Sequence, residues 1–233
     1  MSTLPYRTAL IVGAGPGISA ALARKLAGAG LAVGLAARDV DKLAGLADEI
    51  GAATFQADAA QPASVERLFE AAEARLGPPD VVVYNASARA PGALAELDPE
   101  AVRKAVEVTA FGAFLVVRQA ARRMEPRGTG AILLTGATAG IKGFPRSAAF
   151  AMGKFALRGL AQSAARELGP KGIHVAHVVV DGGVRSERRP EPANAPDSTL
   201  SSDGVAQAYL DLLRQPRDAW TFELDLRPWT ETF

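Results

Sequence analysis

The decapeptide AAFAMGKFAL, residues 148–157, places Phe150 and Lys154 four residues apart in a segment with a helical pattern. In an α-helix that spacing puts the two side chains on one face, one turn apart. A lysine below a phenol is one half of a proton-transfer pair, but position 150 has a phenyl ring and no hydroxyl group. The stretch therefore indicates either an active site without its acid or a helix with no chemical role.

A second group of residues suited to chemistry follows the apolar run TALIV, in the sequence VGAGPGISAALARKLA. Gly13, Gly15 and Gly17 permit a tight turn and a close backbone approach, and the helix that follows would offer its N-terminal amides to a pyrophosphate. Arg38, after the next apolar run, stands where dinucleotide-binding folds read the ribose 2′ position. Ala37-Arg38 offers a cation and no acid, which favours NADP(H) over NAD(H). The alternative is that Arg38 is a solvated residue opening the next helix.

The pattern of the whole chain predicts the scaffold for these residues. Short β-branched runs alternate with longer helical patterns. The predicted strands are TALIV (8–12), LAVGLAA (31–37), AATFQA (52–57), DVVVY (80–84), AILLT (131–135), IHVAHVVV (173–180) and WTFELDL (220–226). The predicted helices lie near 17–29, 40–50, 62–76, 98–124, 147–168 and 203–214. Continuous apolar strands separated by helices indicate a doubly wound α/β fold, a seven-stranded parallel sheet with helices on both faces.

No repeat or low-complexity linker divides the chain, so we expect a single dinucleotide-binding domain over residues 1–233. The long irregular segment DGGVRSERRPEPANAPDSTLSS (181–202) follows the sixth strand. Ligands bind beyond the carboxyl ends of the strands in open α/β sheets, so this segment is expected to be a substrate lid, with a mobile surface loop as the alternative. Its arginines could clamp an anionic substrate, but interleaved Glu187 and Glu191 favour a solvated loop. These arginines are Arg185, Arg188 and Arg189.

Composition excludes several classes of function. Lys plus Arg total 26 against 25 Asp plus Glu, so a net charge of +1 gives no broad field for nucleic acid or an anionic membrane. The absence of cysteine excludes disulfides and thiolate chemistry. His174 and His177 would face opposite sides of a strand and form no metal pair. The N-terminus has no basic region followed by an apolar run, so we expect a cytoplasmic protein. We also expect a small-molecule substrate and no metal.

Together these segments resemble the short-chain dehydrogenase/reductase family, in the family's order and over nearly the whole chain. GAGPGIS is similar to the family's T-G-x-x-x-G-x-G, with Val12 for the threonine and Ser19 for the last glycine. FQADAAQPASVERLF resembles the segment whose aspartate contacts adenine, YNAS (84–87) resembles N-N-A-G, and FAMGK resembles Y-x-x-x-K. KFALRGLAQSAARELGPKGIHVAHVVVDGGV resembles the helix and strand that follow. Five segments in register make the resemblance specific.

The resemblance implies a nicotinamide dinucleotide cofactor and the residues that bind it. The implied positions are Gly13, Gly15, Gly17, Ile18, Arg38, Asp58, Ala59, Asn85, Ala86, Lys154, Gly182, Val184 and Ser186. Lys154 would hold the ribose, and Ser186 would stand where a threonine meets the nicotinamide amide, with Asp181 at the preceding proline position. The family usually pairs its two central helices, so we also expect a homodimer or homotetramer. The predicted outer faces of these helices carry Ala110, Ala113, Val117, Ala164 and Ala165.

The catalytic positions depart from the family pattern. The tyrosine, serine and asparagine positions fall on Phe150, Ala137 and Thr109, and only Lys154 remains. A phenyl ring transfers no proton and a methyl group binds no alkoxide, and such groups contribute about 10²- to 10⁴-fold in rate. Hydride transfer belongs to the nicotinamide, so a substrate with its own proton acceptor, or another donor, would keep the reaction alive.

Four nearby residues are candidates for the missing donor: Thr138, Ser147, Ser87 and Lys154. Ser147 is more simply explained as a helix N-cap, and Thr138 would point away from Ala137. Two functions remain open, an NADP(H)-dependent oxidoreductase with a non-standard active site or an NADP(H)-binding sensor or scaffold without turnover. A third is a structural subunit of a hetero-oligomer of such folds.

Overall fold

The computed structural model describes residues 4–186 and 189–231, in which seven parallel strands form one sheet. The strand order is β3-β2-β1-β4-β5-β6-β7, and every neighbouring pair is parallel. The strands are β1 (Thr8–Val12), β2 (Ala32–Ala37), β3 (Ala53–Gln56), β4 (Val81–Tyr84), β5 (Gly130–Thr135), β6 (Ile173–Val180) and β7 (Glu223–Leu226). This arrangement confirms the predicted doubly wound α/β sheet.

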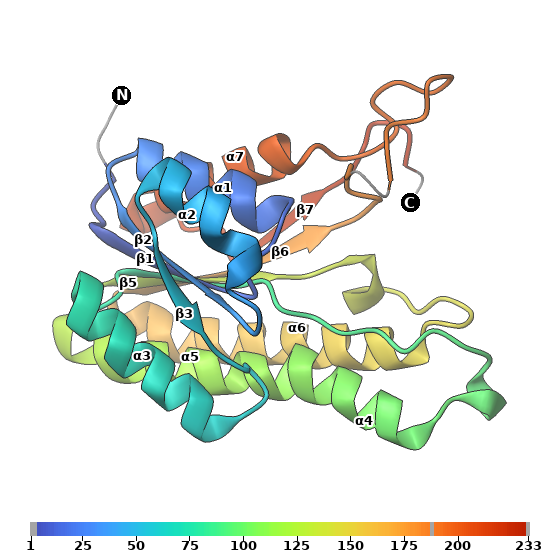
Figure 1. Ribbon diagram of the computed structural model, residues 1–233, viewed down its shortest axis with the longest axis horizontal. Coiled ribbons are helices and arrows are strands. Elements are labelled where there is room, and N and C mark those ends of the chain that lie inside the picture. Colours follow the sequence, from blue (N-terminus) through green and yellow to red (C-terminus); the bar gives the residue numbers. More distant parts are fainter. Residues whose placement is uncertain (1–3, 187–188, 232–233) are drawn as a thin grey trace.

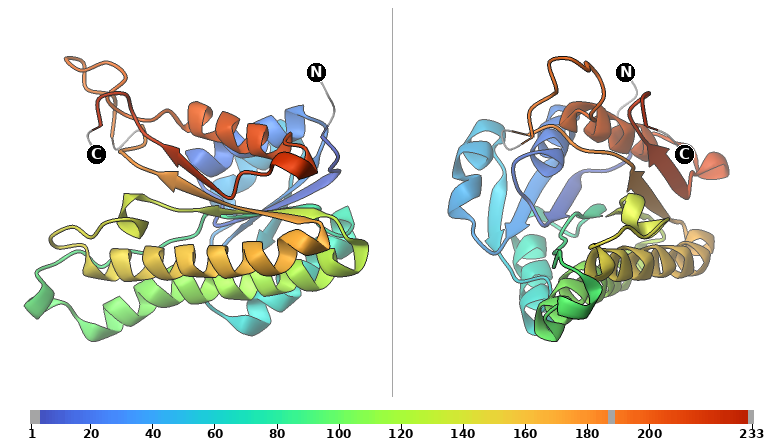
Figure 2. Two further views of the ribbon diagram at one scale, coloured as in Figure 1. Left: turned by 180° about the vertical axis from the view of Figure 1, so that it is seen from behind. Right: turned by 90° about the vertical axis from the view of Figure 1, so that its right-hand side faces the viewer.

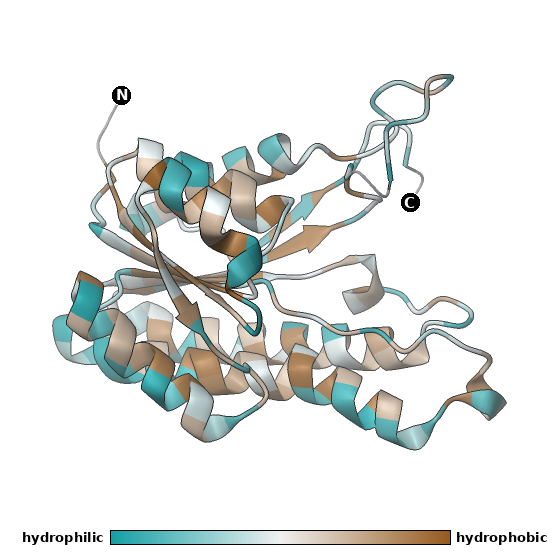
Figure 3. Ribbon diagram, in the orientation of Figure 1, coloured by the Kyte–Doolittle hydropathy of each residue, from teal (hydrophilic) through white to brown (hydrophobic). Residues whose placement is uncertain are grey.

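Helices cover both faces of the sheet (Figure 1). One face carries α1 (Ile18–Gly28), α2 (Ala44–Ile50) and α7 (Ser202–Leu213), and the other carries α3 (Pro62–Leu76), α4 (Pro99–Val106), α5 (Gly112–Met124) and α6 (Ala148–Leu168). Successive side chains of a strand point to opposite faces, so Leu10 and Val82 join one buried cluster while Ile11 and Val83 join the other. The strands are accordingly hydrophobic along most of their length (Figure 3).

A π-helical segment, Glu107–Phe111, interrupts the helix predicted over 98–124. The hydroxyl of Tyr84, at the end of β4, donates a hydrogen bond to the backbone carbonyl of Val108. A Cβ atom on Gly112 would lie 2.5 Å from that hydroxyl oxygen, so glycine leaves the space through which Tyr84 reaches the helix. A side chain inserted into the helical ladder is a known cause of such irregularities.

Two other boundaries differ from the prediction. The last strand begins three residues late, because Trp220 stacks on His174 with ring centroids 4.9 Å apart and the carbonyl of Thr221 bonds to Nε2 of that histidine at 2.9 Å. The backbone there is engaged by a side chain before it joins the sheet. The helix predicted over 40–50 begins as the 3-10 turn Asp41–Leu43, so α2 is shorter than expected.

The loops that follow the strands collect at one side of the molecule. Figures 1 and 2 show that the connections over 85–98, 136–147 and 181–201 project from this side. It is the edge at which the carboxyl ends of β4, β5 and β6 lie, where open parallel sheets bind their ligands. An ion pair between Arg158 of α6 and Glu223 of β7, at 2.6 Å, ties α6 to the last strand of the sheet.

Candidate cofactor and active site

Two cavities lie at this edge of the sheet. The first, of about 330 Å³, lies between the turn after β1, the end of β2 and the loop after β4. The second, of about 490 Å³, lies between the end of β5, α6 and the segment after β6. Asn85 and Ser87 line both cavities, so the two spaces meet at the loop after β4.

The first cavity is built around the glycine turn. Gly13 has a backbone φ of +85°, and a Cβ atom there would lie 2.3 Å from the backbone nitrogen of Ala86. Only glycine fits both the left-handed backbone and this close approach. Ser19 donates a hydrogen bond to the carbonyl of Gly13 at 3.1 Å and accepts one from the amide of Asn85 at 2.7 Å. The serine at the family's glycine position therefore ties the turn to the loop after β4.

The predicted cofactor residues gather around this cavity unevenly. Its lining includes Gly13, Gly15, Arg38, Asp58, Ala59, Asn85 and Ala86. Asp58 is held by its own loop, since the amide of Ala60 donates to its carboxylate at 3.0 Å. Gly17 lines neither cavity and instead stands at the N-cap of α1, with a φ of +116°.

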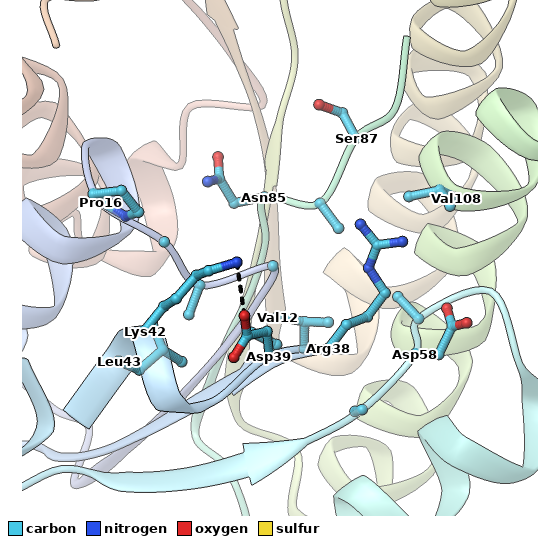
Figure 4. Close-up of a pocket in the computed structure, with 17 residues that line it drawn as sticks. Val12, Pro16, Arg38, Asp39, Lys42, Leu43, Asp58, Asn85, Ser87 and Val108 are labelled. Carbon is cyan, nitrogen blue, oxygen red and sulfur yellow. Dashed lines mark ion pairs between the residues drawn. The ribbon is translucent and has the colours of Figure 1, made fainter. Parts of the chain in front are cut away.

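The part of the first cavity beside Arg38 contains more charge than the sequence pattern predicted. Arg38, Asp39 and Lys42 all line it (Figure 4), so the Ala37-Arg38 pair, which offers a cation and no acid, is followed directly by an acid in the same cavity. Lys42 pairs with Asp39 at 2.7 Å, and its hydrogen bond holds the pKa of that carboxyl below its usual value. Arg38 has no acidic partner among the described residues, so its charge remains available to an anion. Lys42 lies four residues after Arg38, a spacing that could have drawn attention to it.

Phe150 and Lys154 face the second cavity together, as their helical spacing predicts. The Lys154 ammonium nitrogen donates to the carbonyl of Thr135 at 2.6 Å and lies 5.8 Å from the centroid of the Phe150 ring. Burial, aided by the positive charge of Arg89, lowers the pKa of Lys154 to about 7. Ala137, at the serine position, also lines this cavity.

Arg89 is a site residue that sequence reasoning missed. It belongs to the loop after β4, lines the second cavity, and places its guanidinium carbon 4.1 Å from the centroid of the Phe150 ring. This is a cation–π contact. The available signal was its place two residues after Ser87, downstream of the YNAS segment.

The structure separates the candidate replacement donors. Ser87 and Lys154 line the second cavity, whereas Thr138 and Ser147 do not. Ser147 stands at the N-cap of α6 as predicted, but its side chain makes no capping hydrogen bond.

Thr109, at the asparagine position, lines neither cavity. It is fully buried in the π-helical segment, and its hydroxyl accepts a hydrogen bond from the amide of Ala88 at 3.1 Å. A Cβ atom on Gly153 would lie 2.8 Å from the Cβ of Thr109, so α6 packs directly against this residue. Thr109 therefore joins the loop after β4, the π-helical segment and α6.

The base of the predicted lid closes one side of the second cavity. Gly182, Val184 and Ser186 line this cavity together with Ile18 from the start of α1. Val184 forms an isolated bridge with Leu200, near the end of the same segment. Asp181, at the family's proline position, is buried and lies 3.3 Å from Arg227, which links the base of the segment to the chain after β7.

The three arginines of this segment have different surroundings. Arg185 pairs with Glu191 at 2.8 Å and with Asp197 at 3.0 Å, so its charge is used within the segment. Arg189 lines the second cavity. Glu187 and Arg188 lie outside the described residues.

Other expectations concern metals and membranes. In residues 4–186 and 189–231, no group of three or more His, Cys, Asp or Glu side chains is arranged to hold a metal ion. His177 bonds to Glu223 at 2.9 Å, while His174 stacks on Trp220. Within the same residues, no helix is both long and apolar enough to cross a membrane.

Comparison with known proteins agrees with this geometry. Residues 7–194 match the family model described as short chain dehydrogenase. A curated relative, L-2,3-butanediol dehydrogenase of Corynebacterium glutamicum, is 32% identical over 175 residues, which cover 71% of this chain and 67% of the relative. A solved short-chain dehydrogenase from Rhodopseudomonas palustris is 36% identical with a TM-score of 0.83, over 96% of this chain and 99% of that one.

An alcohol dehydrogenase from the archaeon Thermococcus sibiricus, solved in complex with 5-hydroxy-NADP, is also similar. It is 28% identical with a TM-score of 0.86, over 97% of this chain and 98% of that one. Sequence, fold and the position of the two cavities thus point to one conclusion. The chain belongs to the short-chain dehydrogenase/reductase family.

Proposed function

We propose that the protein is an NADP(H)-dependent oxidoreductase with a non-standard active site, acting on a small carbonyl or alcohol compound. The observation that carries this proposal is the junction of the two cavities at Asn85. One cavity offers a glycine turn and the available charge of Arg38, and the other offers the buried ammonium group of Lys154. The complex of the Thermococcus sibiricus relative with 5-hydroxy-NADP supports the choice of cofactor.

The residues present fit such a cofactor. Gly13 lets the turn pack against the loop after β4, where a Cβ atom would strike Ala86, and a glycine turn at the start of a helix suits a pyrophosphate. Arg38 would bind a 2′-phosphate, Asp58 the adenine and Lys154 the nicotinamide ribose. The other residues that would hold the cofactor are Gly15, Gly17, Ile18, Ala59, Asn85, Ala86, Gly182, Val184 and Ser186. When bound, the cofactor supplies the hydride.

Proton transfer is the step for which the side chains of this chain differ from the family pattern. Phe150 and Ala137 have no exchangeable proton, so Ser87 and Lys154 are the hydroxyl and ammonium groups of the predicted set that line the cavity. We propose that Phe150 forms an apolar wall beside the nicotinamide while Lys154 holds the ribose.

A sensor or scaffold that binds NADP(H) without turnover is the second candidate, and the side chains at positions 137 and 150 are the observation that favours it. Stereospecific hydride transfer separates the two. NADPH carrying deuterium at either face of nicotinamide C4 would be incubated with ketones and aldehydes, and the products analysed by mass spectrometry. We expect deuterium transfer from one face only, whereas NADPH binding with no transfer from either face would support the sensor.

We further propose that the chain forms a homodimer or homotetramer through α5 and α6. The predicted contact residues need correction, because Ala113, Val117 and Ala164 are buried within the chain. Large exposed hydrophobic side chains lie there instead, on Phe114 of α5 and on Met152 and Phe155 of α6. Sedimentation at micromolar concentration tests this, and a monomer would contradict it.

The proposed function also involves the domain organisation, the segment after β6 and the location of the protein. We propose that residues 1–233 act as a single dinucleotide-binding domain, that 181–202 serves as a substrate lid, and that the protein works in the cytoplasm. The packing of Val184 against Leu200 supports the lid, because it gives the segment a defined base beside the cavity.

A further inference from the structure

We propose that the second cavity takes a substrate that carries a carboxylate group, and that Arg89 and Arg189 bind this carboxylate. The inference rests on the proposed oxidoreductase function and narrows its substrate class to oxo acids and the corresponding hydroxy acids. In the reduction, the hydride would go from the cofactor to the carbonyl carbon, and one proton would go to the carbonyl oxygen. The products would be the hydroxy acid and NADP⁺.

The charge of the cavity is the first argument. Its described lining contains three cationic side chains, Arg89, Lys154 and Arg189, and no aspartate or glutamate. Throughout the described parts of the chain, no acidic side chain lies within ion-pair distance of any of the three. Lys154 is buried, and the nearby charge of Arg89 contributes to lowering its pKa. Such an arrangement of like charges is unfavourable until an anion enters.

The geometry of Arg89 is the second argument. Its guanidinium carbon lies over the Phe150 ring, 4.1 Å from the ring centroid. A guanidinium group has five N–H donors, and no hydrogen bond from the Arg89 side chain to a described residue is found, so these donors are left for a ligand. The N–H edge of the group is a planar fork that matches the two oxygens of a carboxylate. Phe150 thus acts as a platform that holds Arg89 in place.

Arg189 supplies the third argument, from a different segment of the cavity lining. It lies in the predicted lid and forms two backbone hydrogen bonds with Ser186, at 2.9 and 3.0 Å. A Cβ atom on Gly183 would lie 2.5 Å from the guanidinium nitrogen of Arg189, so the side chain lies directly over the base of the lid. A carboxylate between Arg89 and Arg189 would therefore connect the loop after β4 to the lid.

The pyrophosphate of the cofactor is the other anion to consider. The glycine turn suited to a pyrophosphate lines the first cavity, whereas both arginines line the second. Phe150, whose ring Arg89 contacts, also lines the second cavity and not the first. We therefore assign the two arginines to the substrate.

Binding measurements on the whole protein test the assignment. The probes are 2-oxobutanoate, 2-oxohexanoate, levulinate and phenylglyoxylate, each beside its uncharged methyl ester, at constant ionic strength. Affinities are measured by calorimetry, both with saturating NADPH and without cofactor. We expect at least one acid to bind about tenfold or more tightly than its ester, because charge-assisted hydrogen bonds contribute on this scale.

Variants locate the binding group. Arg89→Gln and Arg189→Gln should each weaken acid binding by about 10- to 100-fold and leave NADPH affinity unchanged. Arg89→Lys keeps the charge without the planar fork and tests whether a loss reflects packing on Phe150. Arg75→Gln, on the exposed surface of α3, is the matched control and should change neither affinity.

The outcomes distinguish this inference from the cofactor assignment. If NADPH binds but no acid binds more tightly than its ester, the carboxylate site is wrong and the cofactor site stands. A loss of NADPH affinity in Arg89→Gln with unchanged acid binding would reassign Arg89 to the cofactor and overturn the inference. If NADPH does not bind at all, the proposed function fails, and the measurements without cofactor still decide whether the cavity takes carboxylates.

Discussion

The two adjoining cavities are built in different ways. The first is shaped mainly by backbone, with the glycine turn passing close to Ala86, and its side-chain charges lie at the rim that Arg38 and Lys42 form. The second is shaped by side chains, with the guanidinium group of Arg89 over the Phe150 ring and Lys154 buried. A backbone cradle suits any ligand that carries a pyrophosphate, whereas side chains determine which reaction takes place. A family fold can therefore keep its first cavity while its second changes chemistry.

The largest expected effect comes from restoring the two hydroxyl groups that the second cavity lacks at positions 137 and 150. We expect Phe150→Tyr combined with Ala137→Ser to raise NADPH-dependent carbonyl reduction by up to about 10²- to 10⁴-fold, because a positioned acid and a donor to the developing alkoxide return together. The measurement is kcat/KM for ketones, aldehydes and oxo acids. The double variant with Lys154→Met added serves as control and should lose the gain. Vigorous wild-type turnover that the double substitution abolishes would show that the phenyl ring serves a different working chemistry.

The buried ammonium group of Lys154, in the second cavity, predicts that the stability of the protein depends on pH. The folded-state pKa of Lys154 is lowered to about 7, so above this pH the unfolded chain binds one more proton and stability rises with pH. One proton corresponds to about 1.4 kcal/mol per pH unit, and because Lys154 is half deprotonated at its folded-state pKa, the gain between pH 7 and 9 is about 2 kcal/mol. That is a change of about 4–8 °C in melting temperature.

The difference between Lys154→Met and wild type isolates this effect. Without cofactor, we expect the melting temperature of Lys154→Met minus that of wild type to be highest below pH 7. This difference should become smaller as the pH rises toward 9, because the wild type becomes more stable. Lys142→Met, on an exposed lysine, is the control and should show a flat difference. A flat difference for Lys154→Met as well would mean that the ammonium group is hydrated.

The role of Arg38 at the rim of the first cavity can be tested by comparing the affinities for NADPH and NADH. Arg38→Ala should weaken NADPH binding by about 10- to 100-fold and leave NADH binding almost unchanged, because a charge-assisted hydrogen bond to the 2′-phosphate is lost. Calorimetric titration with both cofactors measures this, with Arg75→Ala as the remote control. Equal affinities of the wild type for NADPH and NADH would remove the basis for assigning Arg38 to the 2′-phosphate.

The smallest expected effect concerns the backbone of the first cavity. Gly13→Ala should destabilise the cofactor-free protein by at least about 1–2 kcal/mol, because alanine pays a steric cost in the left-handed backbone and its Cβ meets Ala86. The expected fall in melting temperature is about 2–8 °C. Gly15→Ala is the matched control, since a Cβ there meets nothing within 4 Å. Equal melting temperatures for the two variants would contradict the close approach.

The sequence predicted the sheet and most helices because they follow local hydrophobic periodicity. The π-helical segment was not predictable in this way, since it depends on Tyr84 reaching Val108 from a distant strand. The same limit applies to the site. The shared face of Phe150 and Lys154 follows from helical spacing, but the position of Arg89 over the Phe150 ring depends on the path of an irregular loop. The direction of side chains repeats regularly along a helix, and it does not do so along an irregular loop.

The hydrogen bonds of Ser19 have a consequence for the kinetics of binding. Ser19 connects the carbonyl of Gly13 to the side chain of Asn85, so the turn and the loop that separates the two cavities are already fixed to each other in the free protein. Groups held in place before a ligand arrives lose little conformational entropy when it binds. Cofactor association should then be governed by diffusional encounter and electrostatic attraction, with no slow rearrangement of this part of the site.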